Sequence, residues 1–165
     1  MSENIRFKIM DLKQLYQDII LEHGKSPRNL GKCEGHSHEA KGYNPLCGDK
    51  VHVYLKLDDE KKVENLTFEG DGCAISLASA SIMTESVQGK SFEAAKEIMN
   101  AFINMIKNTS EIQSNHLDEE QKIKLMSLSG VKQFPMRVKC ATLSWHTLNS
   151  AMEGKKEEVN TEAID

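Results

Sequence analysis

Three of the four cysteines lie where predicted helices or strands end. Cys47 falls in the loop before a strand, Cys73 at the junction of a strand with a helix, and Cys140 near the start of the last helix. A cysteine that only fills a core usually lies on the apolar face of an element. These positions therefore favour reactive thiols or metal ligands.

The segment Cys47-Gly48-Asp49 adds a carboxylate two residues after a thiol, with a glycine that permits a tight turn. Thiolates with one carboxylate in fourfold coordination suit zinc or iron. The helix N-termini predicted at Cys73 and Cys140 would favour the thiolate, because unpaired N–H groups stabilise negative charge. The long gaps between the cysteines exclude a zinc ribbon, and spacing alone is a weak signal.

The composition indicates the class of protein and the cellular compartment to which these thiols belong. The 165 residues fit one domain, and a hydrophobic content of 39% with only 5% aromatics indicates a core of aliphatic residues and Met. The net charge of −4 argues against a protein that binds nucleic acid over its whole surface. No apolar run suits a transmembrane helix and no secretory signal is visible, so we expect a cytoplasmic protein with reduced thiols.

The periodicity predicts an α+β fold in which a small antiparallel sheet of about three strands is packed with helices, the first element being a helix. We expect a flexible arm over 1–9, one domain over 10–153 and a charged tail over 154–165. In order, the predicted elements are a helix from 11 to 24, strands near 32–43, 51–57 and 65–69, and helices near 74–87, 91–107, 118–128 and 140–152.

The first predicted helix carries one apolar face, typical of a helix packed on a core. That face is made of Leu12, Leu15, Tyr16, Ile19 and Ile20. The helix after Cys73 is instead rich in Ala and Ser, which allows it to pack very close to a sheet.

Three segments resemble those of a known family. They are Asn44-Pro45-Leu46-Cys47-Gly48-Asp49, Gly72-Cys73-Ala74-Ile75-Ser76 and Lys139-Cys140-Ala141-Thr142-Leu143. In this order they resemble the signature segments of the IscU/SufU/NifU N-terminal iron–sulfur cluster assembly family, over about residues 10–153. The chain is more similar to the SufU branch, because Lys139 stands where IscU scaffolds have His and a SufU-type insertion lies around 110–135.

The resemblance implies an NifU/IscU-like fold in which Cys47, Asp49, Cys73 and Cys140 bind one zinc ion. It also implies that Cys47 accepts persulfide sulfur from a SufS-like, PLP-dependent cysteine desulfurase, on behalf of other iron–sulfur assembly proteins. Arg137 matches an arginine of the branch and would steer or stabilise this transfer. Zinc suits the task, because a coordinated thiol is deprotonated and zinc has no redox chemistry.

Two other functions remain open at this stage. Nearly the same residues would serve a scaffold on which a [2Fe–2S] cluster is assembled and passed on. Lys139 favours sulfur transfer, since a lysine cannot replace a neutral imidazole ligand. The third reading is a non-catalytic, zinc-stabilised adaptor that chelation would unfold.

The remaining candidates have simpler explanations. Cys33 lies outside the three segments and is expected to be an ordinary thiol. His36 and His38 alternate and could face one metal, but a solvated edge strand explains them more simply. His146 follows Cys140 by six residues and is expected to be structural or on the surface.

Overall fold

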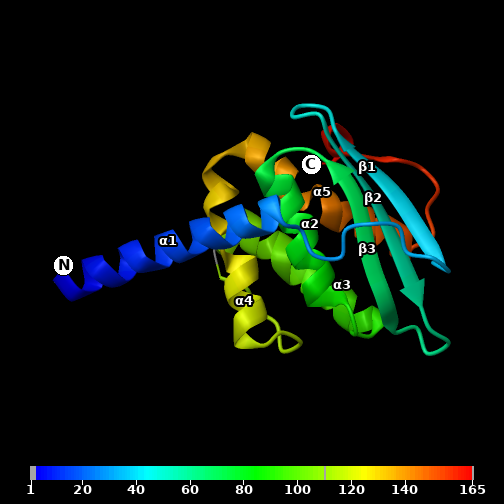
Figure 1. The fold of residues 1–165 in the computed structure, drawn as a ribbon, viewed down its shortest axis with the longest axis horizontal. Coiled ribbons are helices and arrows are strands. Elements are labelled where there is room, and N and C mark those ends of the chain that lie inside the picture. The colour runs from blue at the N-terminus through cyan, green and yellow to red at the C-terminus, as the bar shows by residue number, and fades with distance from the viewer. Residues whose placement is uncertain (1–2, 110, 165) are drawn as a thin grey trace.

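The computed structural model describes residues 3–109 and 111–164 (Figure 1). It confirms the α+β class with a helix first. The elements in chain order are α1 (Glu3–Lys25), β1 (His38–Asn44), β2 (Asp49–Leu57), β3 (Val63–Asp71), α2 (Ala74–Val87), α3 (Phe92–Asn104), the π-helical turn η1 (Met105–Thr109), α4 (Glu119–Met126), the 3₁₀ helix η2 (Ser129–Gln133), α5 (Pro135–Met152), β4 (Val159–Asn160) and the 3₁₀ helix η3 (Thr161–Ala163).

The sheet has the strand order β3-β2-β1-β4. The three long strands pair antiparallel, as predicted, and a register shift falls between Lys56 and Leu57. The short β4 pairs parallel with β1, matching Gly42 with Val159 and Tyr43 with Asn160. The sheet is therefore mixed, with a strand at one edge that comes from the C-terminal segment.

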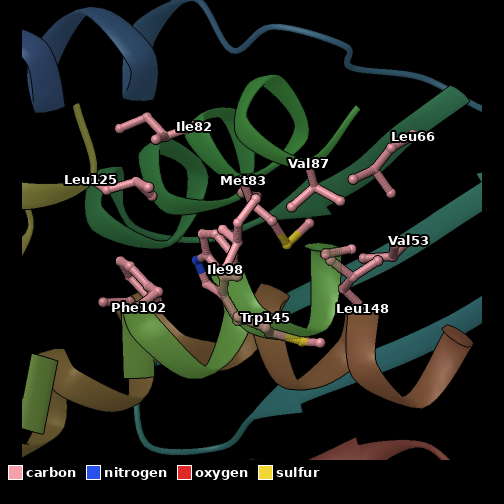
Figure 2. Packing of buried hydrophobic residues seen from close by; sticks show 14 of the residues in the cluster. Val53, Leu66, Ile82, Met83, Val87, Ile98, Phe102, Leu125, Trp145 and Leu148 are labelled. Atoms are coloured by element: carbon pink, nitrogen blue, oxygen red, sulfur yellow. The ribbon is translucent and has the colours of Figure 1, made fainter. Parts of the chain in front are cut away.

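The helices lie on one face of the sheet, as Figure 1 shows. α2 and α5 contact the strands, while α1 and α4 pack on α2, and α3 packs on α5. The core between these layers is mostly aliphatic with several methionines, as the composition predicts (Figure 2). Its aromatic centre is a stack of Phe102 on Trp145, with 4.4 Å between ring centroids. No helix in the described part of the chain is long and apolar enough to cross a membrane.

The first helix differs from the prediction at its start. α1 begins at Glu3, so most of the arm expected over 1–9 is helical. Its N-terminal half projects away from the other elements (Figure 1), and Leu12 and Leu15 are 47% and 43% exposed. Only Ile19 and Ile20, farther along, pack against the core. The expected apolar face is thus buried only where the helix has the rest of the protein beside it.

The last helix and the tail also differ. α5 begins at Pro135 instead of near Cys140, because a proline lacks the N–H that the first turn of a helix would leave unpaired. The charged residues 155–158 are exposed, as expected for a tail, but β4 and η3 follow them in ordered contact with the sheet. Between 110 and 135 the chain forms α4, which Asp118 starts with a capping box, and η2.

Candidate metal centre

Three segments far apart in the sequence meet at one end of the sheet. Cys47 lies in the turn between β1 and β2, Asp49 begins β2, Cys73 caps α2 and Cys140 belongs to α5. Ligand atoms of Cys47, Asp49 and Cys140 all lie within 4.8 Å of one another. The two sulfur atoms of Cys140 and Cys47 are 3.2 Å apart. The structure thus brings together three of the four predicted metal ligands.

Asp49 is completely buried, and both of its oxygens are held by neutral N–H groups. The backbone N–H of Cys73 donates to Oδ1 at 2.9 Å, and the Asn44 side-chain amide donates to Oδ2 at 3.2 Å. A carboxylate oxygen keeps a second lone pair beside one such bond. Burying a charge is costly unless it is paired or bound to a metal. The arrangement therefore suits a cation coordinated by Asp49.

Two glycines allow the chain to approach this carboxylate. Gly48 has φ +73°, a left-handed conformation that lets Cys47 and Asp49 turn toward one point, and its N–H donates to the Asn44 carbonyl at 2.9 Å. A Cβ atom at Gly72 would lie only 2.3 Å from Asp49 Oδ1. Gly72 is therefore required by space, and it lets the start of α2 close over the carboxylate.

Cys73 is prepared to act as a thiolate. It is the N-cap of α2, as predicted, and its Sγ accepts the Ser76 backbone N–H at 3.4 Å. The pKa of Cys73 is lowered to about 7. The main cause is a hydrogen bond from the Cys140 thiol; the bond from Ser76 adds to it, and partial burial acts in the opposite direction. Cys73 is thus adjacent to the group of three and linked to it through Cys140 and Asp49.

Cys140 has the opposite character. The prediction that it lies near a helix N-terminus is wrong, because α5 starts at Pro135 and Cys140 falls in its second turn. It is 2% exposed, and the Asn44 amide lies 3.5 Å from its sulfur. Hydrogen bonding to Cys73, followed by burial, raises the pKa of the Cys140 thiol. Without a metal, Cys140 is therefore the thiol and Cys73 the thiolate of this hydrogen-bonded pair, and a metal bound to Cys140 would have to displace its proton.

The cluster opens to solvent through a mostly apolar cavity of about 570 Å³. All three cysteines line it, together with Phe134, Met136 and Arg137. The guanidinium of Arg137 lies over the Phe134 ring, 4.7 Å from its centroid. Arg137 is exposed, so it places a positive charge at the rim of the cavity.

The other candidates lie apart from this cluster. Cys33 is buried and its Sγ accepts the Asn65 amide at 3.4 Å. Nε2 of His36 lies 3.2 Å from Glu39, and His38 contacts its neighbour Ser37. His146 is partly buried in α5, and burial lowers its pKa.

Sequence reasoning assigned no role to two residues that support the cluster. Asn44 begins the segment Asn44–Asp49 that resembles the family, and this position was the only indication in the sequence that it could support the site. Thr161, whose hydroxyl donates to Asn44 Oδ1 at 2.9 Å, lies in the charged tail, and nothing in its local sequence indicates a role.

Comparisons with known proteins agree with this geometry. Residues 15–154 match the family model described as the NifU-like N terminal domain. The chain is 40% identical over 148 residues to the zinc-dependent sulfurtransferase SufU of Bacillus subtilis, covering 90% of this chain and 95% of that protein. It is 36% identical over 142 residues to the iron–sulfur cluster assembly scaffold protein IscU of Streptococcus pyogenes, covering 86% and 85%.

Solved structures show the same fold. A crystal structure of a SUF-system scaffold protein from Fervidobacterium islandicum superimposes with a TM-score of 0.71 at 36% identity, covering 82% of this chain and 94% of that one. The N-terminal part of a NifU-like protein from Brucella abortus gives a TM-score of 0.72 at 23% identity, which supports the fold alone.

Proposed function

Because the chain belongs to the NifU-like N-terminal domain family of iron–sulfur cluster assembly proteins, and to its SufU-type branch, we propose that it is a zinc-dependent sulfur acceptor. It takes persulfide sulfur from a PLP-dependent cysteine desulfurase and passes it on for cluster assembly. The observation that carries this proposal is the convergence of Cys47, Asp49 and Cys140 around one point, with Cys73 beside them. This partnership belongs in the cytoplasm, where thiols stay reduced.

The donor set fits zinc. Three thiols and one carboxylate match its preference for sulfur and oxygen ligands in a tetrahedral site. Zinc, when bound, would keep the thiols deprotonated at neutral pH without redox chemistry of its own. The protein's own contribution is orientation, since neutral N–H groups fix both oxygens of Asp49 and the start of α2 supports Cys73 as a thiolate.

Cys47 is the proposed acceptor because of its position. It is exposed on the turn that contains Gly48, whereas Cys140 is buried in a helix. Cys73 is also exposed, but its sulfur caps α2 by accepting the Ser76 N–H. Its thiolate would attack the terminal sulfur of the desulfurase persulfide. The S–S bond of the donor breaks, its electron pair leaves on the desulfurase cysteine, and the transferred sulfur stays on Cys47 as a new persulfide. No external oxidant or reductant is needed.

Arg137 is proposed to assist at the rim of the cavity. An exposed guanidinium there attracts the negative persulfide and stabilises the thiolate that leaves. The apolar side chains around it, Phe134 and Met136, are 48% and 51% exposed and form a surface suited to contact with a partner protein.

Stimulation of a cysteine desulfurase tests this function. Zinc-loaded protein should accelerate alanine release from cysteine, Cys47→Ala should abolish the acceleration, and Cys33→Ala should retain it. Cys33 is a suitable control because it is also a free thiol but does not belong to the cluster. Normal stimulation by Cys47→Ala would rule out the proposed acceptor.

A second candidate function is a scaffold for a [2Fe–2S] cluster, which the IscU scaffold relative favours. The same thiols would then hold iron. Anaerobic reconstitution with iron and sulfide should give a stable, transferable cluster if this function is correct, and prior zinc loading should block it.

A further inference from the structure

The C-terminal segment lies directly against the strand that leads into the metal centre. β4 pairs Val159 with Gly42 and Asn160 with Tyr43, the two residues before Asn44. The family match ends at residue 154, so the segment over 159–163 lies beyond the part of the chain that it covers. Its contact with the site must therefore be explained from this chain itself.

Thr161 fixes the orientation of the Asn44 side chain. Asn44 is fully buried and Thr161 is 2% exposed, so their hydrogen bond is shielded from water. The Thr161 hydroxyl donates to Asn44 Oδ1 at 2.9 Å. Because this oxygen is engaged on the side of Thr161, the Nδ2 group of Asn44 must point to the opposite side.

That opposite side is the metal centre. Asn44 Nδ2 lies 3.2 Å from Asp49 Oδ2 and 3.5 Å from Cys140 Sγ. Both are acceptors when they carry the negative charge of metal ligands, and N–H donors stabilise that charge. If the Asn44 side-chain amide were rotated by half a turn, its oxygen would face Asp49 Oδ2 and Cys140 Sγ, and the negative charges would repel one another.

We propose that Thr161 and Asn44 are positioning residues that make Asp49 and Cys140 the retained ligands of the metal. Cys73 is also exposed, but its sulfur is held by the Ser76 N–H at 3.4 Å as the cap of α2. This leaves Cys47, exposed on its glycine-containing turn, as the ligand free to leave and to accept sulfur. This inference rests on the proposed function for the presence of zinc, but the orientation of Asn44 does not depend on the metal. The C-terminal segment thus helps to hold the two ligands that stay in place when Cys47 leaves.

Glu162 offers a matched control in the same segment. Its carboxylate pairs with Lys139 at 2.8 Å, and the two side chains are 44% and 30% exposed. An exposed ion pair contributes little to stability. Replacing Glu162 should therefore disturb the segment without reaching Asn44.

The first test measures zinc affinity by competition with a chromophoric chelator. Thr161→Val keeps the shape of the side chain but removes the donor, and it should weaken zinc binding by about 10–100-fold, as loss of a residue that orients a ligand does. Thr161→Ser restores the hydroxyl and should bind as the original protein does, as should Glu162→Gln. Equal affinity for the Val and Ser variants, both folded by circular dichroism, would overturn the proposal.

The second test asks which cysteine is released. Zinc-loaded protein is treated with iodoacetamide, and the alkylated peptides are quantified by mass spectrometry. The zinc content of the alkylated protein is then measured. In the original protein and in Thr161→Ser, alkylation of Cys47 should leave zinc bound by the retained ligands, whereas in Thr161→Val the zinc should be lost when Cys47 is alkylated. Equal retention of zinc by alkylated Thr161→Val and by the alkylated original protein would contradict the role assigned to Thr161.

A third measurement separates this inference from the proposed function. In metal-free protein the Asn44 side-chain amide should exchange slowly with solvent by NMR, and Thr161→Val should accelerate this exchange. Zinc that fails to bind the original protein would refute the zinc-dependent function, while the Asn44 amide would still report the orientation. Equal exchange in the Val variant and the original protein would refute the orientation.

Discussion

Gly72→Ala should disable the metal centre through one methyl group. The added Cβ would lie 2.3 Å from Asp49 Oδ1 and 3.0 Å from its Cγ, well inside van der Waals contact. Asp49 is fully buried and both of its oxygens accept hydrogen bonds, so turning it away would break those bonds. The carboxylate or the start of α2 must therefore move by about 1 Å to reach ordinary contact distance, whereas metal–ligand distances tolerate only about 0.2 Å.

The magnitude follows from the contact that this movement breaks. Asp49 Oδ1 accepts the backbone N–H of Cys73 at 2.9 Å, a bond to a charged group. Such bonds contribute about 1.5–3 kcal/mol. Since about 1.4 kcal/mol corresponds to a factor of ten in an equilibrium constant, loss of this bond should lower zinc affinity by about 10- to 100-fold.

Gly130→Ala is the matched control, since a Cβ at Gly130 meets no atom within 4 Å. Zinc affinity is measured by competition with a chromophoric chelator, with thermal unfolding of the metal-free proteins run alongside. We expect a large loss for Gly72→Ala and none for Gly130→Ala. Zinc binding by folded Gly72→Ala at the original affinity would refute the role assigned to Asp49.

Three further predictions concern protons and packing. Burial lowers the pKa of His23, so the unfolded chain binds more protons than the folded protein as the pH drops from 7 to 5. The free energy of unfolding should therefore fall over this range. Urea unfolding at each pH should show a weaker pH dependence for His23→Gln. In metal-free protein, alkylation of Cys73 should rise with pH around a midpoint of about 7 while Cys140 stays unreactive; a reactive Cys140 there would contradict the proton assignment. Ser79→Ala removes the acceptor of the Trp145 indole N–H, which now bonds to the Ser79 hydroxyl at 3.1 Å. Because the buried N–H is then unpaired, the free energy of unfolding measured with denaturant should fall by about 1–3 kcal/mol, and an unchanged value would contradict this.

Most residues of the candidate site could be placed from the sequence because they stand next to strong local signals. Gly70 and Gly72 end a strand and a run of small residues follows, so Cys73 had to lie at a helix start. The expected start of the last helix near Cys140 is wrong because the helix begins at Pro135, and a proline suits the first turn of a helix although it breaks the interior of one. The error matters chemically, since a helix N-terminus would favour the thiolate of Cys140, whereas its hydrogen bond to Cys73, followed by burial, raises its pKa and favours the thiol.

The strand β4 and the contact of Thr161 with Asn44 could not be predicted, because they depend on long-range contacts that no local pattern encodes. β4 has two residues and pairs through its backbone, so it leaves no periodicity to detect. Thr161 meets Asn44 only because the register of β4 on β1 brings them together. The exposure of Leu12 and Leu15 in α1 could not be predicted for a related reason, because an apolar face predicts burial only where another element lies beside it.

The central claim is that Cys47 receives the sulfur, and peptide mass spectrometry tests it most directly. Zinc-loaded protein is mixed with a cysteine desulfurase and isotopically labelled cysteine for one turnover, then trapped with an alkylating agent and digested. We predict one labelled sulfur atom on the Cys47 peptide and none on the peptides of Cys33, Cys73 and Cys140. Label on another cysteine, with Cys47 unmodified, would contradict the account.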